Sequence, residues 1–256
     1  NHGEDIKELH WYLDATPSMS YLKMLYKYPQ RAFPYETLVR ENAARSKEER
    51  EFELLDTGVF DDDRYFDVEI EWAKADTDDV LLRITAFNRG PEDADLWVLP
   101  QLFFRNTWAW EEDPHHPRIA KAGDRELVAD HDDLGEYTLV SDGTPQVLLC
   151  ENETNVERLY GGPRDGRVFK DGIGDFVVDG RTDAARTEGS GTKAALVHRL
   201  RVPAGGSAVA RARLAPRLPR RPFERFDETV SKRVLDADDF FGLFRNRVIE
   251  EDLRTV

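Results

Sequence analysis

The residues best suited to bind a sugar lie within one short segment. Asn106, Trp108 and Trp110 are spaced two apart, so they share one face if the preceding strand continues through them. Flat indole rings beside an amide can hold a sugar ring by apolar stacking and by hydrogen bonds to its hydroxyls. The alternative is that the two tryptophans fill the core or a seam between domains. The apolar strand that leads into them favours this second interpretation.

Five polar residues in the first seven positions form a second candidate group: Asn1, His2, Glu4, Asp5 and Lys7. Paired carboxylates can perform general acid–base catalysis, and a lysine can hold one of them ionised. The chain contains 51 acidic residues, so adjacent pairs also arise by chance, and an exposed strand edge is the simpler interpretation. We therefore keep Glu4 and Asp5 as substrate-binding candidates and assign no catalytic residue.

Other clusters lack the spacing that their chemistry needs. His115–His116 lies between two prolines, which does not aim both imidazoles at one ion. Asp61–Asp63 followed by Asp67 lacks the glycine and the terminal glutamate of a helix-loop-helix calcium site. The sequence has no nucleophilic-serine elbow, phosphate-binding loop, Cys-x-x-Cys pair or His-Glu-x-x-His motif. We expect no metal ion and no cofactor.

The elements that must position these residues are mostly strands. From Phe66 to Trp72 large apolar residues alternate with Asp67, Glu69 and Glu71, which predicts a half-buried strand with its carboxylates in water. Further strands are predicted at Val80–Ala86, as the antiparallel partner of the first, and at Leu96–Phe104, Tyr137–Val140, Gln146–Cys150, Ala194–Val202 and Ser207–Leu214. The segment Leu96–Phe104 is apolar on both faces and is expected between two packed layers. The fold class is mainly β, an antiparallel β-sandwich.

Three segments depart from this pattern. The spacing in Tyr21–Tyr26 predicts a short helix that ends before Pro29, and Glu36–Arg45 predicts a second one. Near the C-terminus apolar residues at helical spacing predict a helix over 228–251, with Asp227 as its N-cap. We interpret it as a connector whose apolar face has no partner within the sandwich. The predicted domains are therefore a sandwich over 1–222 and a helical connector over 223–256, with a long ordered loop between Gly161 and Gly191.

Composition excludes several classes of protein. The 256 residues carry a formal net charge of −15, which repels phosphate backbones and anionic lipid headgroups and argues against nucleic-acid and membrane partners. Hydrophobic residues make up 40% of the chain and aromatic residues 11%, too many for a disordered protein. Cys150 is the sole cysteine, so no internal disulfide forms, which fits a reducing, cytoplasmic location. Both ends look cut from a longer protein, because strand-like alternation begins near Asn1 and the predicted helix runs almost to Val256.

Several strings along the chain resemble a known family, the large bacterial glucosidase-like proteins of glycoside hydrolase family 63, a group also described as mannosylglycerate-hydrolase-like. The strings are Asn1–Glu8, Tyr26–Gln30, Leu55–Phe60, Arg105–Trp108, Asn152–Asn155, Lys170–Ile173 and Gly191–Ala194. The resemblance implies an N-terminal β-sandwich of the super-sandwich type, followed by an (α/α)6 barrel that holds two catalytic carboxylates. It further implies hydrolysis of an α-glycosidic bond with inversion, in which one carboxylic acid protonates the leaving oxygen and a carboxylate activates water.

This sequence matches the sandwich and the start of the connector, so the resemblance transfers no catalytic residue to it. We expect a non-catalytic sandwich that packs on, and shapes, a catalytic barrel of the same parent chain. The alternative is a stand-alone carbohydrate-binding or structural sandwich, whose Trp108 and Trp110 bind glycan. Carbohydrate is thus a candidate ligand under both hypotheses.

Overall fold

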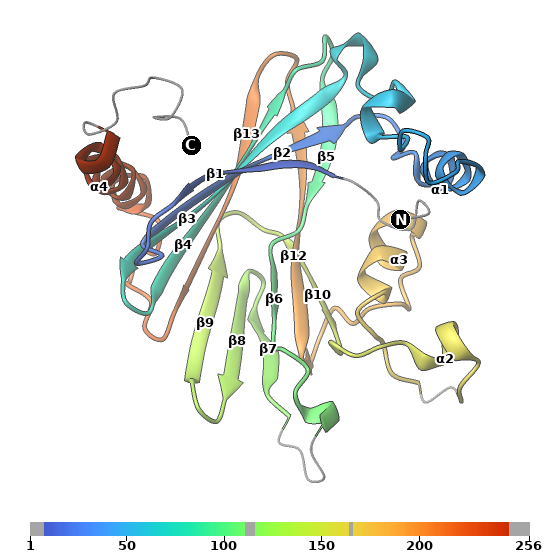
Figure 1. The fold of residues 1–256 in the computed structure, drawn as a ribbon. Helices are drawn as coiled ribbons and strands as arrows, with labels where there is room; N and C mark the ends of the chain where they lie inside the picture. The colour runs from blue at the N-terminus through green and yellow to red at the C-terminus, as the bar shows by residue number, and fades with distance from the viewer. Residues whose placement is uncertain (1–7, 111–115, 164–165, 246–256) are drawn as a thin grey trace.

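The computed structural model describes residues 8–110, 116–163 and 166–245, which form an antiparallel β-sandwich with helices on its outer surfaces (Figure 1). The described part of the larger sheet contains nine strands, in spatial order β1 (Leu9–Ala15), β2 (Tyr21–Pro29), β3 (Tyr65–Asp76), β4 (Asp79–Asn88), β13 (Ser207–Ala215), β9 (Gly135–Ser141), β8 (Glu126–His131), β7 (Arg118–Gly123) and β11 (Ser190–Gly191). The smaller sheet contains β10 (Gln146–Cys150), β12 (Lys193–Val202), β5 (Ala94–Val98) and β6 (Gln101–Phe103). The predicted fold class is therefore confirmed.

The predicted hairpin is also confirmed, because β3 and β4 pair antiparallel with Ile70 opposite Ile84. In the small sheet, β12 pairs with β10 along one edge and with β5 and β6 along the other. The turn over 203–206 then carries the chain from β12 in the small sheet to β13 in the large one. This crossing ties the two layers together.

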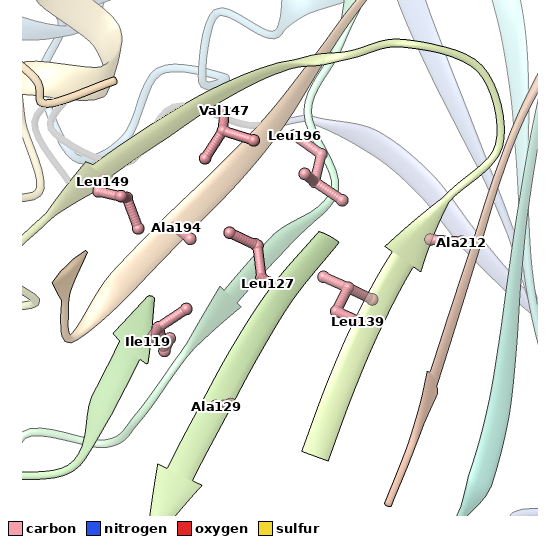
Figure 2. Close-up of a cluster of buried hydrophobic side chains, with 9 residues drawn as sticks. All are labelled: Ile119, Leu127, Ala129, Leu139, Val147, Leu149, Ala194, Leu196 and Ala212. Carbon is pink, nitrogen blue, oxygen red and sulfur yellow. The ribbon is translucent and has the colours of Figure 1, made fainter. Parts of the chain in front are cut away.

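The core lies between the facing sides of the two sheets and forms two clusters. Figure 2 shows the first, in which Ile119, Leu127 and Leu139 of the large sheet face Leu149 and Leu196 of the small one. The second lies nearer the other end of the sandwich and is built from β3, β4, β5, β12 and β13. Burial of these side chains holds the layers together, at roughly 25 cal/mol for each Å² of apolar surface removed from water.

Helices cover the outer surfaces of the sandwich unequally. They are α1 (Tyr35–Ala44), α2 (Val156–Tyr160), α3 (Gly172–Asp179) and α4 (Phe226–Arg245), with 3-10 turns η1 (Leu54–Thr57), η2 (Asp61–Asp63) and η3 (Trp108–Trp110). Helix α4 packs on the large sheet and α3 on the small one, on opposite sides of the molecule (Figure 1). The prediction of a helix at Glu36–Arg45 is confirmed by α1, and that of a C-terminal helix by α4 for the residues described. None of the described helices combines the length and the apolar character that crossing a membrane requires.

The helix predicted at Tyr21–Tyr26 is wrong, because this segment is strand β2, paired with β1 and β3. Tyr21 is buried beneath α4, whereas Tyr26 packs into the core between the sheets. Strand β2 carries apolar residues at both even and odd positions, and here this imitates helical spacing. Sheet pairing therefore overrides the local pattern.

The predicted exposure of Glu71 is also wrong, since only 4% of this residue is exposed. Tyr21 donates a hydrogen bond to Glu71 Oε1 at 2.7 Å, and Arg83 Nε donates to Oε2 at 2.7 Å. Burial would raise the pKa of Glu71, but these two donors outweigh it and the pKa is lowered. The physical reason is α4, whose Phe226 and Val230 cover this face of β3. The apolar face of the predicted connector thus has a partner along its first half.

The segment Leu96–Phe104 is two strands instead of one, and its burial on both faces is wrong. Strands β5 and β6 are separated at Pro100, which cannot donate a ladder hydrogen bond. Leu96 and Val98 point into the core, whereas Trp97 and Phe103 lie exposed on the outer face. The loop predicted over 161–191 likewise contains α3 and β11, whose Gly172 and Gly191 pack tightly against neighbouring backbone.

Candidate functional site

The segment with the predicted tryptophan pair is not a strand. Trp108, Ala109 and Trp110 form the 3-10 turn η3, and Asn106 Oδ1 accepts a hydrogen bond from Ala109 N at 3.2 Å. Only 5% of Trp108 is exposed, against 69% of Trp110. The two indoles therefore do not form one flat platform on a shared strand face.

Trp108 is held by contacts within the protein. Its Nε1 donates to Glu153 Oε1 at 3.2 Å, and Arg167 Nη1 lies 2.7 Å from Glu153 Oε2. The ring of His116 lies 5.5 Å from the indole, centroid to centroid. These contacts suit a buried structural residue. The Trp110 ring is exposed and has the Arg105 guanidinium 5.2 Å from its centre. Sugar binding by either side chain stays a prediction.

Glu4, Asp5 and His115 lie outside the described residues. Asp62 pairs with Arg31 at 2.6 Å, as expected for a solvated acidic turn. Within the described ranges, no group of three or more His, Cys, Asp or Glu side chains is arranged to hold a metal ion. Burial raises the pKa of the Cys150 thiol to about 12, so this thiol is neutral near pH 7 and is a poor nucleophile.

Strings that are distant in the sequence meet at one end of the sandwich. Asn152 Nδ2 donates to Phe104 O at 2.8 Å, and the backbone N–H of Asn152 donates to Thr192 Oγ1 at 2.8 Å. A Cβ at Gly191 would lie 2.3 Å from Cys150 O, so only glycine permits this approach of the two segments. These residues of the family-like strings thus have structural roles, and the Asn152 amide is engaged within the protein.

The carboxylates of α3 are also engaged. Arg158 Nη1 lies 3.0 Å from both Asp171 Oδ2 and Asp175 Oδ1, and Arg181 Nη1 lies 2.9 Å from Asp175 Oδ2. Asn155 Nδ2 donates to Asp171 Oδ2 at 3.0 Å. Carboxylates bridged by guanidinium groups lock α2 onto α3, which is a different task from transferring a proton.

The open groove with the best equipment for a ligand lies on the outer face of the small sheet. It has a volume of about 710 Å³ and runs between β5, α3 and the end of β2. Its lining includes Trp97, Gln101, Lys170, Lys193 and, from α3, Val177. Trp97 is 44% exposed, so part of its indole is available to a ligand.

The electrostatics of this groove are uneven. Asp95 is its lining carboxylate, and it is already paired with Arg199 at 2.8 Å and Arg201 at 3.1 Å. Over the described residues, neither Lys170 nor Lys193 has a carboxylate within 4.0 Å of its ammonium group. Burial, and in smaller part the nearby Lys170, lower the pKa of Lys193. The groove thus presents uncompensated positive charge beside an indole.

The sequence analysis missed Trp97, although a signal for it exists. Arg199 and Arg201 alternate with Leu200 and Val202 in the strand that pairs with β5, so the outer face of that strand is polar. A residue opposite Arg199 must share this wet face. Finding it requires the register of two strands about a hundred residues apart, which the local pattern does not contain.

Comparison with known proteins gives a relative but no family. No family model matches the chain. The chain is 35% identical over 290 residues to an uncharacterized protein of Saccharomyces cerevisiae, YMR196W, covering 98% of this chain and 26% of that protein. It therefore spans about a quarter of the length of this curated relative.

Three solved structures are similar to parts of this chain, and their names describe sugar-processing enzymes. A polysaccharide lyase matches at 13% identity with a TM-score of 0.37, over 80% of this chain and 22% of that one. A putative kojibiose phosphorylase from the human microbiome matches at 10% identity with a TM-score of 0.36, over 91% and 23%. A putative aldose 1-epimerase of Escherichia coli K12 matches at 8% identity with a TM-score of 0.35, over 80% and 67%. At TM-scores below 0.5, these likenesses carry no information on the ligand or reaction of this chain.

Proposed function

We propose that this chain is the non-catalytic β-sandwich of an inverting α-glycoside hydrolase, which packs on a catalytic domain of the same protein and shapes its active site. The reaction comes from the family resemblance of the strings in the sequence. The packing role is supported by the surface of the sandwich. The parent protein, the catalytic barrel and a cytoplasmic location are parts of this proposal.

The observation that carries the proposal is an apolar groove on the large sheet that is left open by the elements the structure describes. This groove has a volume of about 630 Å³ and is lined by Tyr12, Met19, Leu22, Met24 and Trp72. Tyr12 is 80% exposed, and Met19 is exposed as well. Contiguous apolar surface of this kind marks a contact with another protein surface, and here we assign it to the catalytic domain.

The proposal is tested by activity and by one surface charge. The purified chain should release nothing above buffer from aryl α-glucosides or small α-linked disaccharides, whereas the complete protein should hydrolyse one of them. Tyr12→Glu in the complete protein should weaken domain packing and lower activity, because a carboxylate would be desolvated at the contact. Tyr160→Glu is the matched control, because Tyr160 is similarly exposed on α2, away from this groove.

Two outcomes would contradict the proposal. Turnover by the chain alone, lost on substitution of Glu4 or Asp5, would make the N-terminal carboxylates catalytic. Equal activity of the Tyr12→Glu and Tyr160→Glu proteins would show that the groove does not contact the catalytic domain. A chain that binds glycan and needs no second domain would support the alternative, a stand-alone carbohydrate-binding sandwich.

A further inference from the structure

The groove on the small sheet has the form of a small-ligand site. Its floor is the outer face of β5 and β6, with Trp97 and Gln101, and one wall is α3, with Ile173 and Val177. A volume of about 710 Å³ lies within the range of sites that hold small molecules. It lies on a different sheet from the apolar groove assigned above to domain packing.

Trp97 is positioned before any ligand arrives. The guanidinium of Arg199, its cross-strand partner, lies 5.0 Å from the indole ring. Arg199 is itself fixed by Asp95, at 2.8 Å. An indole held in this way loses little conformational entropy when a ring stacks on it, and the axial C–H groups of a pyranose suit such a surface.

The two lysines of the groove favour a ligand that carries a negative charge. Lys193 Nζ lies 4.8 Å above the ring of Phe103 and is half-buried, whereas Lys170 is exposed at the α3 side of the groove. Like charges that share one groove repel each other, and in the described residues no carboxylate offsets them within ion-pair distance. An anionic group between them would remove this repulsion and gain charge-assisted hydrogen bonds.

We propose that this groove binds a pyranose that carries a negatively charged substituent, a carboxylate or a phosphate, with the ring on Trp97 and the anion at Lys170 and Lys193. The Gln101 amide, at the floor, is placed to hydrogen-bond a ring hydroxyl. This inference goes beyond the packing role proposed above and does not depend on it, because it concerns another face of the sandwich.

The test is a titration of the full chain, followed by tryptophan fluorescence and by calorimetry. The probes are glucuronate, galacturonate and glucose 6-phosphate, with glucose and inorganic phosphate as reference ligands. At least one anionic sugar should bind with a dissociation constant of about 1 mM, as expected for a few contacts, and more weakly as salt is added. Glucose and inorganic phosphate should each bind at least about tenfold more weakly, because glucose lacks the charged group and phosphate lacks the pyranose ring. Preference for glucose 6-phosphate or for the uronates identifies the anion.

Variants decide whether the binding is in this groove. Trp97→Ala should weaken binding at least about tenfold, and Lys170→Gln should weaken it and flatten its salt dependence. Trp110→Ala is the matched control and should bind as the unmodified chain does, because Trp110 is exposed but lies outside the groove. A single cooperative thermal unfolding transition shows that each variant is folded. The proposal is overturned if none of the three anionic sugars gives a saturable response, if Trp97→Ala binds normally, or if glucose binds as tightly as they do.

Discussion

The outer faces of the two sheets differ in how far helices cover them. On the large sheet α4 covers the face of β3 and leaves 4% of Glu71 exposed, although this glutamate alternates with apolar residues as a solvent-facing one would. On the small sheet α3 covers Cys150 of β10 and Val197 of β12 but stops short of β5, where 44% of Trp97 is exposed. A tryptophan is therefore in water and a glutamate is buried. Alternation along a strand places side chains on two faces, but helices from distant parts of the chain determine which of these faces is buried.

The covering helix carries charge as well as apolar surface. Asp227, in the first turn of α4, lies 3.0 Å from Arg211 Nη1 and 3.6 Å from Arg83 Nη1. Arg83 in turn holds Glu71, so the buried carboxylate is linked to the helix through one guanidinium. The outer face of the large sheet that α4 covers, here called the closed face, thus contributes stability. The outer face of β5 around Trp97, here called the open face, remains available to a ligand.

The largest expected effect is the loss of the anchor of α4. Phe226 is fully buried against Tyr21 and Leu81, so Phe226→Ala should lower the free energy of unfolding by about 4 kcal/mol. Phe244→Ala, at the exposed end of the same helix, should cost less than about 1 kcal/mol. Chemical denaturation of both variants measures the difference. Similar losses would mean that α4 packs on the sheet along its whole length.

The two tryptophans of η3 should also differ in how much each contributes to the free energy of unfolding. Trp108→Ala should cost about 3 kcal/mol, because it empties a buried site and leaves Glu153 without its indole donor. Trp110→Ala should change the free energy of unfolding by about 0.5 kcal/mol or less. Denaturation curves check both values. A stable Trp108→Ala protein would revive the interpretation of Trp108 as a ligand-binding residue.

Removal of the buried carboxylate tests the closed face directly. Glu71→Ala leaves the Tyr21 hydroxyl without its acceptor and Arg83 with only Asp227, at 3.6 Å. It should cost about 2 kcal/mol, below the range for fully buried pairs, because Arg83 reaches solvent. Glu69→Ala removes only a surface pair with Lys23 and should cost about 0.5 kcal/mol. Equal costs for the two variants would show that α4 does not seal this face in solution.

The exposed outer face of β5 should tolerate the loss of its tryptophan side chain. Trp97→Ala loses the contact with Arg199 and the buried part of an indole that is 44% exposed, so we expect a cost of about 1.5 kcal/mol, well below that of Phe226→Ala. Thermal unfolding beside the Phe226→Ala protein provides the comparison. A loss as large as that of Phe226→Ala would show that the outer face of β5 is buried in solution, and would close the proposed ligand groove.

The smallest effect concerns pH. His198 is buried, with Nε2 2.9 Å from Ser141 Oγ, and burial lowers its pKa below 6.5, partly offset by Asp142. The imidazole therefore binds a proton more tightly in the unfolded chain than in the folded one. The contribution of His198 to stability is fully present above pH 6.5 and is lost as the pH falls below that value. His198→Gln should reduce the loss of stability between pH 7 and pH 5. Identical pH dependence in the two proteins would contradict a buried neutral His198.

The sequence predicted the fold best where turn residues bound a short apolar, alternating or amphipathic segment. The β3–β4 hairpin, the strands β10 and β13 and the helix α1 follow from alternation, turn residues and amphipathic spacing over a few residues. The pattern misleads at Tyr21–Tyr26 because that strand carries apolar residues on both faces, which imitates helical spacing. The pattern singled out Trp108 and Trp110, which do not line the groove, and missed Trp97, whose surroundings come from β12, α3 and the end of β2.

From the order of its residues alone, this chain is a mainly β protein with an acidic surface, one cysteine and tryptophans as its best candidate ligand-binding groups. These properties depend on composition and on patterns of two to four residues, which survive without knowledge of long-range contacts. Which tryptophan is in water and which carboxylate is buried depend on β12 pairing with β5 and on α4 reaching β3. Residues separated by about a hundred positions or more set these environments. The local sequence determines which side chains share a face of a strand, but solvent exposure depends on which layer packs against that face.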